Sequence, residues 1–464
     1  MVAEAAAPDR WVAPPESREF VDRLAAGKAA RLRTPRSAHA RWEPGAGRFD
    51  PVDVLQKDDE TRLPQLVPVR YARMVPSPFT FYRGAASIMA RDLAQTPISG
   101  MRTQICGDCH LLNFGAFATP ERNYVFDVND FDETAWGPWE FDVKRLATSF
   151  VIAGRHLELR PGECEAAALA ALRSYRERIY EYAGRHVLDV WYARLDELAL
   201  AQAVHSAQER HRLGDAPTKA RSATSAHLFP RITDPERGRR RIVDQPPLLF
   251  HPADDAGFME NVRATFGRYR DSLPDERRAL FDRFRLVDAA YKVVGVGSVG
   301  TRCWIALFLA DEDDPLVLQV KEARASVHEP FVGESGFRSE GERVVVGQRL
   351  MQAASDVFLG WSRDDEGHDY YFRQLRDLKT SANIDRMTAG DLRQYAVICG
   401  WALARAHAKA GGESAMIAGY LGRGDLFDRA VLAFAHDYAD QNERDYAALL
   451  AAVKAGRIVV ANSA

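Results

Sequence analysis

The chain has 464 residues and a formal net charge of -3, with 46% hydrophobic and 27% charged residues, which is the composition of an ordinary globular protein. The near-neutral charge gives no reason to expect a nucleic-acid partner, and no stretch has the apolar length that a membrane span requires. Five cysteines, an odd number in so long a chain, argue against a disulfide framework.

The first 70 residues are rich in Pro, Arg and Ala, and we expect them to lie over a core rather than to form one. Residues 1–16 contain no basic segment followed by an apolar core, so no export signal is predicted and we expect a cytoplasmic protein. A helical pattern covers residues 77–93, and two short strands are expected at 103–106 and 124–126. The sequence does not indicate an oligomeric state.

Helical periodicity continues over residues 141–213 and resumes over 258–284. A β-branched and aromatic segment follows, with strands predicted at 291–296, 302–309, 316–320 and 370–372 and a helix at 344–354. The remainder is helical, in two stretches that end near residues 411 and 453. A small β-rich segment between two helical ones predicts an α+β fold, which we divide into residues 1–285, 286–380 and 381–464.

An Asp and an Asn with the spacing of a kinase catalytic loop follow the first predicted strand. Asp108 ends the strand-like piece, and Asn113 comes five residues later. In such a loop the Asp accepts the proton of the attacking hydroxyl, while the Asn binds a metal ion on the phosphates. The motif predicts catalytic roles for both residues and a metal-ligand role for Asn113.

An acidic cluster follows the second predicted strand and supplies candidate metal ligands. The apolar run ends at Asp127, which we therefore favour as the main Mg²⁺ carboxylate, with Asp130 as the alternate. Four carboxylates within residues 127–133 repel one another unless a cation or a basic group lies among them. The alternative is that this segment is only a solvated turn.

Residues 137–146 contain Gly137, Pro138, Asp142 and Leu146. This stretch resembles the segment that follows the metal-binding Asp in aminoglycoside-phosphotransferase-like kinases. The resemblance implies that Asp142 holds the catalytic loop through backbone hydrogen bonds. A helix N-cap is a compatible second role for this residue.

A glycine-rich turn lies far along the chain, between two strand-like segments. Gly295, Gly297 and Gly300 match the pattern G-x-G-x-x-G, with Ser298 among them. A strand rather than a helix follows, which favours a phosphate-covering hairpin over a dinucleotide-binding turn, because backbone N–H groups can approach phosphates where no Cβ intervenes. An ordinary tight hairpin is the alternative.

The next strand ends in Lys321, which fits the kinase lysine that pairs with the α- and β-phosphates of ATP. A kinase also needs a carboxylate on the following helix to orient this lysine, and we favour Glu342 over Glu340. The strand at residues 370–372 is expected to lead into an adenine-binding hinge, which places Gln374 and Leu375 near the base.

The order of these motifs is reversed relative to ordinary kinases, where the glycine turn and lysine come first. Active sites are defined by geometry rather than by chain order, and circular permutation is tolerated where the ends of a domain lie close together. The helix that contains Trp401 and His407 would normally precede the catalytic loop. We therefore expect a two-lobed, circularly permuted kinase-like fold with a small β-rich lobe and a large helical lobe.

Nearly the whole chain resembles a bacterial family of uncharacterised proteins, catalogued as a domain of unknown function (number twenty-two fifty-two). The stretches that carry the resemblance are residues 73–84, 107–115, 126–133, 296–300, 319–323, 347–352, 373–379 and 438–441. The resemblance implies no activity, so the kinase-like interpretation rests on the residues described above.

The motifs together predict an ATP- and Mg²⁺-dependent phosphotransferase that acts on a hydroxyl of a small molecule or a protein. A pseudokinase-like nucleotide-binding protein and a nucleotidyltransferase on the same fold are the alternatives. Two further motifs are weaker rivals. Cys106, Cys109 and His110 have the spacing of a haem-attachment or zinc motif, and residues 130–134 resemble the nucleophile loop of haloacid-dehalogenase-like phosphatases.

Overall fold

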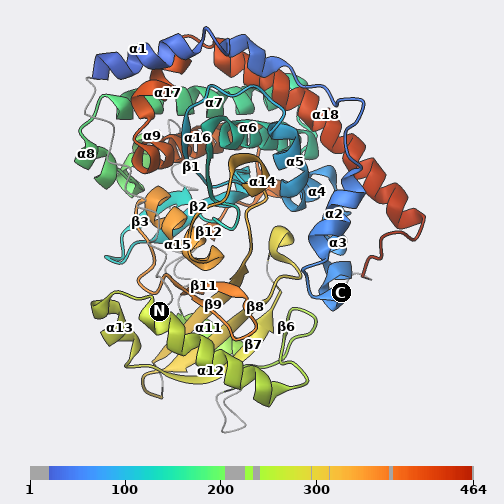
Figure 1. Ribbon diagram of the computed structural model, residues 1–464, viewed down its shortest axis with the longest axis vertical. Coiled ribbons are helices and arrows are strands. Elements are labelled where there is room, and N and C mark those ends of the chain that lie inside the picture. The colour runs from blue at the N-terminus through green and yellow to red at the C-terminus, as the bar shows by residue number, and fades with distance from the viewer. Residues whose placement is uncertain are drawn as a thin grey trace, which may run out of the picture.

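The computed structural model describes residues 20–203, 225–233, 241–293, 295–312, 314–375 and 380–461. These residues form a mixed α+β structure, with an antiparallel sheet at one end and a helical part at the other (Figure 1). Residues 1–19, on which the expectation of a cytoplasmic protein partly rests, lie outside the described ranges. None of the helices found within those ranges is both long and apolar enough to span a membrane.

Six strands in the order β10-β11-β9-β8-β7-β6 form the main sheet, and each is antiparallel to its neighbour. Their bounds are β6 Leu249–Phe250, β7 Arg285–Lys292, β8 Cys303–Leu309, β9 Pro315–Ala323, β10 Gly360–Arg363 and β11 Asp369–Gln374. Strand β8 is buried throughout, because both faces of the sheet are covered. Its hairpin with β9 confirms the strands predicted at residues 302–309 and 316–320.

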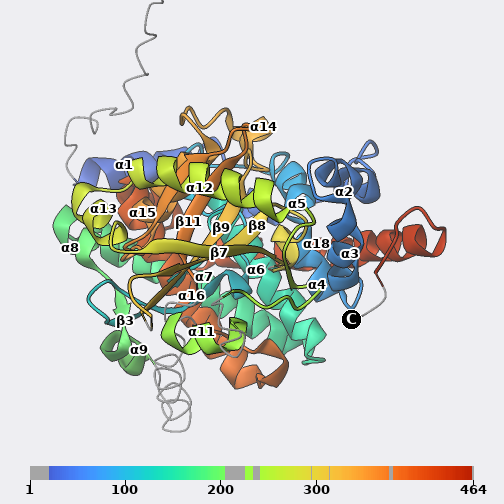
Figure 2. The same cartoon turned by 90° about the horizontal axis from the view of Figure 1, so that it is seen from below.

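The two faces of the sheet pack against different helices, as the two-residue period of a strand requires. Trp304 and Phe308 face α12 (Asp255–Asp271), which crosses the sheet in Figure 2. Ile305 and Leu307 face α11 (Ser225–Ile232) instead. Helix α13 (Asp275–Phe281) contributes Phe281 to the first of these clusters.

The part of the chain that packs with the main sheet begins before the predicted boundary at residue 286, because α11, α12 and α13 belong to it. These helices and β6 pack against the sheet, so the sheet-containing part begins near residue 225. The pattern over 258–284 correctly predicted helix, but it could not show which element covers its apolar face. The structure also divides that stretch in two, since Pro274 is the N-cap residue of α13.

The helical part is built from segments at both ends of the chain, which share one core (Figure 1). Its main helices are α6 Trp139–His156, α7 Pro161–Ala183, α16 Ala389–Gly411, α17 Ser414–Leu421 and α18 Leu426–Lys454. Helices α16 and α7 cross closely at Gly400, where an added Cβ would lie 2.2 Å from the Ala171 carbonyl oxygen. The C-terminal helices therefore complete the core that the earlier segments begin.

From residue 20 on, the N-terminal segment is largely helical and lies along the helical part, as expected of a covering segment (Figure 1). Its helices are α1 Phe20–Ala30, α2 Pro51–Asp59, α3 Val67–Met74, α4 Pro78–Gly84 and α5 Ala86–Leu93. The helix predicted at residues 77–93 is thus interrupted at Ala85. A capping box between Ser77 and Thr80 fixes the start of α4. Helices α2 and α3 also form a small core of their own with the end of α18.

Short strands hold the loops between the sheet and the helical part. Strands β1 (Arg102–Ile105) and β4 (Ala135–Pro138) form one pair. A second sheet has the order β12-β2-β3-β5, made of Thr380–Ser381, Phe114–Ala118, Tyr124–Val128 and Leu195–Asp196. The remaining helices are α8 Val187–Tyr192, α9 Glu197–Ala203, α14 Glu329–Val332 and α15 Glu340–Met351.

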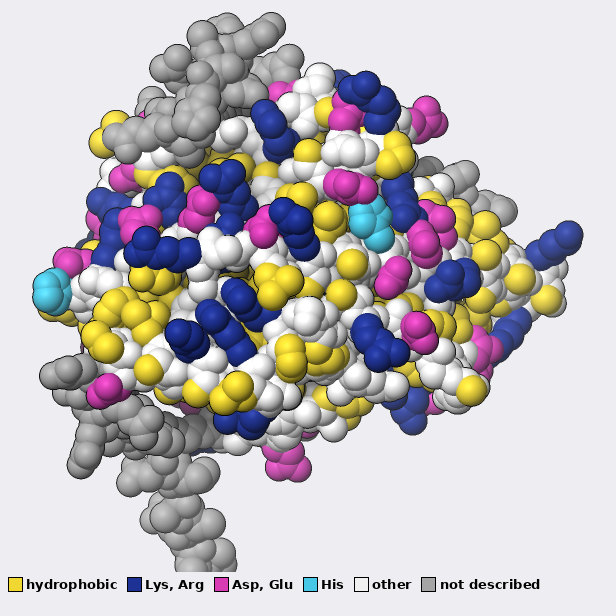
Figure 3. All heavy atoms as spheres, turned by 90° about the horizontal axis from the view of Figure 1, so that it is seen from above, with side chains coloured by type: hydrophobic (Ala, Val, Ile, Leu, Met, Phe, Trp, Pro, Cys, Tyr) yellow, Lys and Arg dark blue, Asp and Glu magenta, His cyan; other side chains and the backbone are white. Residues whose placement is uncertain are grey.

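The surface mixes basic, acidic and hydrophobic side chains over the face shown in Figure 3, as the near-neutral net charge leads one to expect. All five cysteines are free and buried.

Candidate active site

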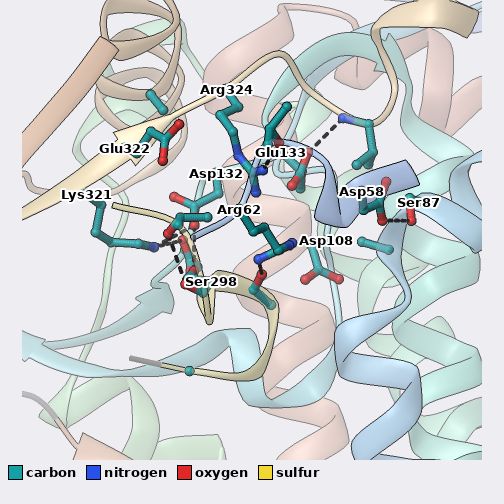
Figure 4. Close-up of a pocket in the computed structure, with 18 of the residues that line it drawn as sticks. Asp58, Arg62, Ser87, Asp108, Asp132, Glu133, Ser298, Lys321, Glu322 and Arg324 are labelled. Atoms are coloured by element: carbon teal, nitrogen blue, oxygen red, sulfur yellow. Dashed lines mark hydrogen bonds and ion pairs between the residues drawn. The ribbon is translucent and has the colours of Figure 1, made fainter. Parts of the chain in front are cut away.

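A cavity of about 830 Å³ is lined by residues from both the sheet and the helical part. Its lining comes from α2 and the turn after it, from the end of α4 and the start of α5, and from the loop that follows β1. The acidic loop between β3 and β4, the glycine-rich turn and strand β9 also contribute (Figure 4), as do the residues after β9 and strand β11 with the turn before it. Segments more than 180 positions apart in the chain therefore meet here.

The loop after β1 is held by Asp142, as the resemblance to aminoglycoside-phosphotransferase-like kinases implied. The Asp142 carboxylate accepts hydrogen bonds from the backbone N–H groups of Cys106 (2.8 Å) and Gly107 (3.0 Å). His407, on α16, lies 3.2 Å from the same carboxylate. Gly107 has φ +82°, a conformation that favours glycine. The predicted backbone hydrogen bonds between this loop and Asp142 are present.

Asp108 faces the cavity at the centre of this loop (Figure 4). One carboxylate oxygen lies 2.5 Å from the Arg145 guanidinium, and the other is 3.8 Å from His110 Nε2. Burial alone would raise the pKa of Asp108, but Arg145 and then His110 outweigh it and hold the pKa below its usual value. Asp108 is therefore an ionised acceptor at neutral pH.

His110 packs in the loop beside Asp108. Burial lowers its pKa to about 4, against the opposing effect of Asp108, so the imidazole is neutral at pH 7. Its Nδ1 accepts a hydrogen bond from the Leu112 backbone N–H at 3.2 Å.

Asn113 joins the loop after β1 to the acidic loop. Its Nδ2 donates to the carbonyl oxygens of Asp108 (3.0 Å) and Asp130 (3.1 Å). Because both amide protons are used in this way, the amide oxygen is the atom that can serve as a metal ligand. Asn113 also lines the cavity.

Asp127 does not reach the cavity, so its assignment as the main metal carboxylate has to be revised. Its side chain is completely buried and paired with Arg405 of α16, whose Nη2 lies 2.8 and 2.9 Å from the two carboxylate oxygens. Backbone N–H groups of Val128 and Ala353 also donate to it. Asp127 lies within β3, all five residues of which are buried, so its side chain points into the core rather than into the turn that follows.

The acidic-loop carboxylates that contact Lys321 in the cavity are those of Asp130 and Asp132, three and five residues further along. Lys321 Nζ lies 2.5 Å from Asp132 and 3.4 Å from Asp130. Asp132 also accepts hydrogen bonds from Tyr371 (2.6 Å) and Ser298 (3.1 Å). Burial opposes ionisation of Asp132, but Lys321 outweighs it and lowers the pKa to about 2. The same two carboxylates raise the pKa of Lys321 against the effect of its burial.

Glu342 is not the partner of Lys321. Its carboxylate accepts a hydrogen bond from the Arg338 backbone N–H at 2.9 Å and does not line the cavity. The next residue, Arg343, points inward and donates to the Asp132 carbonyl oxygen at 2.9 Å. Successive residues of a helix lie about 100° apart, so only one of the two can face the acidic loop. Through Arg343, helix α15 therefore binds the backbone of the acidic loop. The carboxylate partner of Lys321 comes from the acidic loop and not from this helix.

The glycine-rich turn covers one side of the cavity. Gly295, Gly297 and Ser298 line the cavity, and residues 296–298 form a short 3-10 turn. Gly300 has φ +87° and lies behind this turn, where its carbonyl oxygen accepts a hydrogen bond from Leu63 N–H at 2.7 Å. The structure thus places the predicted turn at the cavity, except for Gly300.

Gln374 and Leu375 do not line the cavity. The Gln374 backbone N–H donates to Asp356, and its side chain points to the opposite face of β11 from Arg373, which does line the cavity. Leu375 is buried with Leu228 and Ile232 of α11. Residues 376–379, which continue the expected hinge, lie outside the described ranges.

The rival motifs find no support. Cys106 and Cys109 are fully buried, and burial raises the pKa of both thiols, which leaves them protonated. Their potential metal-binding neighbour is Asp142 rather than His110, and Asp142 is engaged by the loop N–H groups. Asp130 is separated from β3 by Asn129 and lies next to antiparallel strands, unlike the phosphatase nucleophile that it resembles in sequence.

Several cavity residues had no recognisable signal in the sequence. Arg62 donates to the carbonyl oxygens of Gly297 (3.0 Å) and Val299 (2.5 Å), so the N-terminal segment holds the glycine-rich turn. Glu133 accepts a hydrogen bond from Val327 N–H at 2.8 Å, and burial raises its pKa to about 7. Only the cluster of acidic residues at 127–133 could have drawn attention to Glu133, and nothing in the local pattern marks Arg62.

The chain belongs to a bacterial family described as uncharacterized proteins conserved in bacteria (DUF2252), whose model matches residues 62–452. The match begins at Arg62 and spans every cavity residue discussed above except those of α2 and the turn directly after it. No curated protein and no solved structure matches the chain.

Proposed function

We propose that this protein transfers the γ-phosphoryl group of ATP to a hydroxyl group, with Mg²⁺, on a circularly permuted kinase-like fold. The observation that supports this most directly is the convergence of four features on one cavity. These are a glycine-rich turn, a buried lysine at the end of a strand, a pair of acidic side chains and an Asp–Asn loop.

The phosphate side of the proposed site is the glycine-rich turn together with Lys321. Gly295 and Gly297 have open space or only a backbone atom at 3.7 Å where a Cβ would be, so phosphates can approach the backbone N–H groups. Lys321 provides a fixed positive charge at the floor of the cavity. In the absence of nucleotide its charge is balanced by Asp132 and Asp130, and phosphates would share it.

The residues present fit a Mg²⁺ ion. Asp130 and Asp132 offer carboxylate oxygens and Asn113 an amide oxygen, which are the hard oxygen ligands that Mg²⁺ prefers. These three side chains come from two loops that the Asn113 hydrogen bond to Asp130 joins. When bound there, the ion neutralises charge on the transferred phosphoryl group.

Asp108 takes the role of proton acceptor in this proposal. The acceptor oxygen forms the new bond to the γ-phosphorus, and the bond between that phosphorus and the β,γ-bridging oxygen breaks, so that ADP leaves with the electron pair. The hydroxyl proton passes to Asp108, whose carboxylate Arg145 orients. Most of the rate enhancement then comes from positioning and from fixed charges.

The positions of the helices support the proposed permutation. In this proposal α16, near the C-terminus, corresponds to the helix that precedes the catalytic loop of ordinary kinases. Its His407 contacts Asp142 below that loop, and its Arg405 contacts Asp127 on the strand leading to the acidic loop. Both contacts support the idea that the two ends of the chain together complete one kinase-like helical part.

The proposal is tested by incubating the purified protein with Mg²⁺, ATP labelled at the γ-phosphate and a metabolite extract, and by mass analysis of the products. A mass gain of one phosphate supports it, and a gain of one nucleotide indicates nucleotidyl transfer instead. Asp108→Asn is expected to fold and to reduce turnover by about 10²–10⁴. Binding of ATP with no product, from the extract or from the protein itself, would indicate a nucleotide-binding protein without transferase activity.

A further inference from the structure

Arg83 is a cation that faces the cavity without a partner. It lies in the last turn of α4 and lines the cavity beside Asp108. No hydrogen bond or ion pair joins its guanidinium to any of the residues that the structure describes, and its Nε is buried without a partner. Burial lowers its pKa, Asp108 opposes this and Arg73 adds to it.

The other cations around the cavity have partners in the protein, apart from the exposed Lys57. Arg70 lies 2.7 Å from Asp59, Arg302 lies 3.4 Å from Glu322, and Lys321 is paired with Asp132. Arg62 is held by the backbone carbonyl oxygens of the glycine-rich turn, and Arg324 donates to Thr61. Among the described cavity cations that are at least partly buried, Arg83 is the one whose charge has no partner in the fold.

Arg83 is partly buried, and of its guanidinium nitrogens only Nε is both removed from water and without a partner. A partly buried guanidinium is stabilised by an anion beside it. The C-terminal dipole of α4 favours a cation at this position, but this helix has only seven residues and the effect is small. Asp108 is the carboxylate that raises the pKa of Arg83, but it already forms an ion pair of 2.5 Å with Arg145. An anionic group of a ligand would therefore satisfy Arg83.

We infer that the acceptor is a small anionic alcohol, whose phosphate or carboxylate group binds Arg83 while its hydroxyl meets Asp108. This inference rests on the proposed function, because Asp108 is the proton acceptor in it. In Figure 4 Asp108 lies on the opposite side of Arg62 from Lys321 and Ser298. Arg83 and Asp108 both line the cavity and interact electrostatically, so we assign the anionic group to the Asp108 side of the cavity. Arginine suits both anions because its planar fork donates two parallel hydrogen bonds.

The test uses inorganic phosphate as probe and the full-length protein saturated with Mg²⁺ and a non-hydrolysable ATP analogue, so that the nucleotide phosphate site is filled. Calorimetric titration with phosphate is compared for wild type, Arg83→Gln, Arg83→Lys and Arg91→Gln. Arg91 lies on the next helix, α5, and does not line the cavity. Glycerol serves as the neutral probe, and thermal unfolding shows whether each variant is folded.

We expect the wild type and Arg91→Gln to bind phosphate saturably and to bind no glycerol. Arg83→Gln should bind phosphate at least about tenfold more weakly, and Arg83→Lys should retain part of the affinity. The inference is overturned if the wild type binds no phosphate under these conditions, or if Arg83→Gln binds it as tightly as the wild type. Should Arg83→Gln not fold, the comparison between Arg83→Lys and Arg91→Gln decides, because a bidentate site is weakened by lysine. Failure of the nucleotide analogue to bind would instead overturn the proposed function, and that step is measured first.

Discussion

Lys321 and Asp132 are 189 positions apart in the chain and form an ion pair of 2.5 Å at the floor of the cavity. The pair joins a cavity-lining residue of strand β9 to the acidic loop, which contacts the helical part. The lysine is almost completely buried, and a charge in such a place is stable only when it is paired and hydrogen-bonded. The ion pair therefore holds the sheet and the helical part together at the cavity.

Asp127 and Asp130 should respond differently to substitution, because one supports the core and the other faces the cavity. Asp127→Ala leaves Arg405 buried without its carboxylate and should lower the free energy of unfolding by about 3–5 kcal/mol. Asp130→Ala removes a partly exposed partner of Lys321 and should cost about 1 kcal/mol or less. Urea unfolding of both variants measures this difference.

The same two variants separate the metal-binding roles. Asp130→Ala is expected to lose Mg²⁺-dependent activity while it keeps its fold. A stable Asp127→Ala variant that has lost its response to Mg²⁺ would mean that Asp127 is the metal ligand after all.

Gly107 should not tolerate a side chain. Its φ of +82° is strained for any other residue, at about 1–3 kcal/mol, and a Cβ would lie 2.0 Å from the Glu133 carbonyl oxygen. Gly100 is a matched control, with φ +90° and no atom within 4 Å of its Cβ position. Denaturant unfolding should show Gly107→Ala to be less stable than Gly100→Ala. Equal losses for the two variants would show that the contact with Glu133 is not tight.

Glu133 should make stability depend on pH between about 4.5 and 7. Its folded-state pKa of about 7 lies above the ordinary value of 4.5, mainly because of burial. In that window the folded protein keeps a proton that the unfolded chain has released, so stability falls as the pH rises. Thermal unfolding of Glu133→Gln at several pH values should show a growing advantage over wild type from pH 4.5 to 7. The exposed Glu43→Gln is the control, and parallel curves for Glu133→Gln and wild type would contradict the assignment.

The sequence predicted the elements whose pattern is local. The hairpin of β8 and β9 has a continuous apolar run on each side of a turn, and it leads directly to Lys321. The loop with Asp108 and Asn113 follows a short strand, and both residues line the cavity. Asp142 was found through a resemblance, and its hydrogen bonds to the loop are present.

The errors arose where the answer depends on long-range packing. The choice of Asp127 over Asp130 required knowing that the Asp127 side chain pairs in the core with Arg405, which is 278 positions away. Glu342 and Arg343 are adjacent, and only the orientation of α15 shows which one faces the site. Arg62 contacts the glycine-rich turn across 235 positions, and no periodicity could reveal that.

The central claim, that the glycine-rich turn and Lys321 bind the phosphates of ATP, is tested most directly by calorimetric titration of Mg²⁺ and ATP into wild type, Lys321→Met and Lys454→Met. Lys454 lies at the exposed end of α18 and controls for the loss of one positive charge. We expect the wild type and Lys454→Met to bind equally and Lys321→Met to bind at least about tenfold more weakly, a difference of about 1.4 kcal/mol. Binding of equal strength by a folded Lys321→Met variant, or no binding of ATP by the wild type, would contradict the claim.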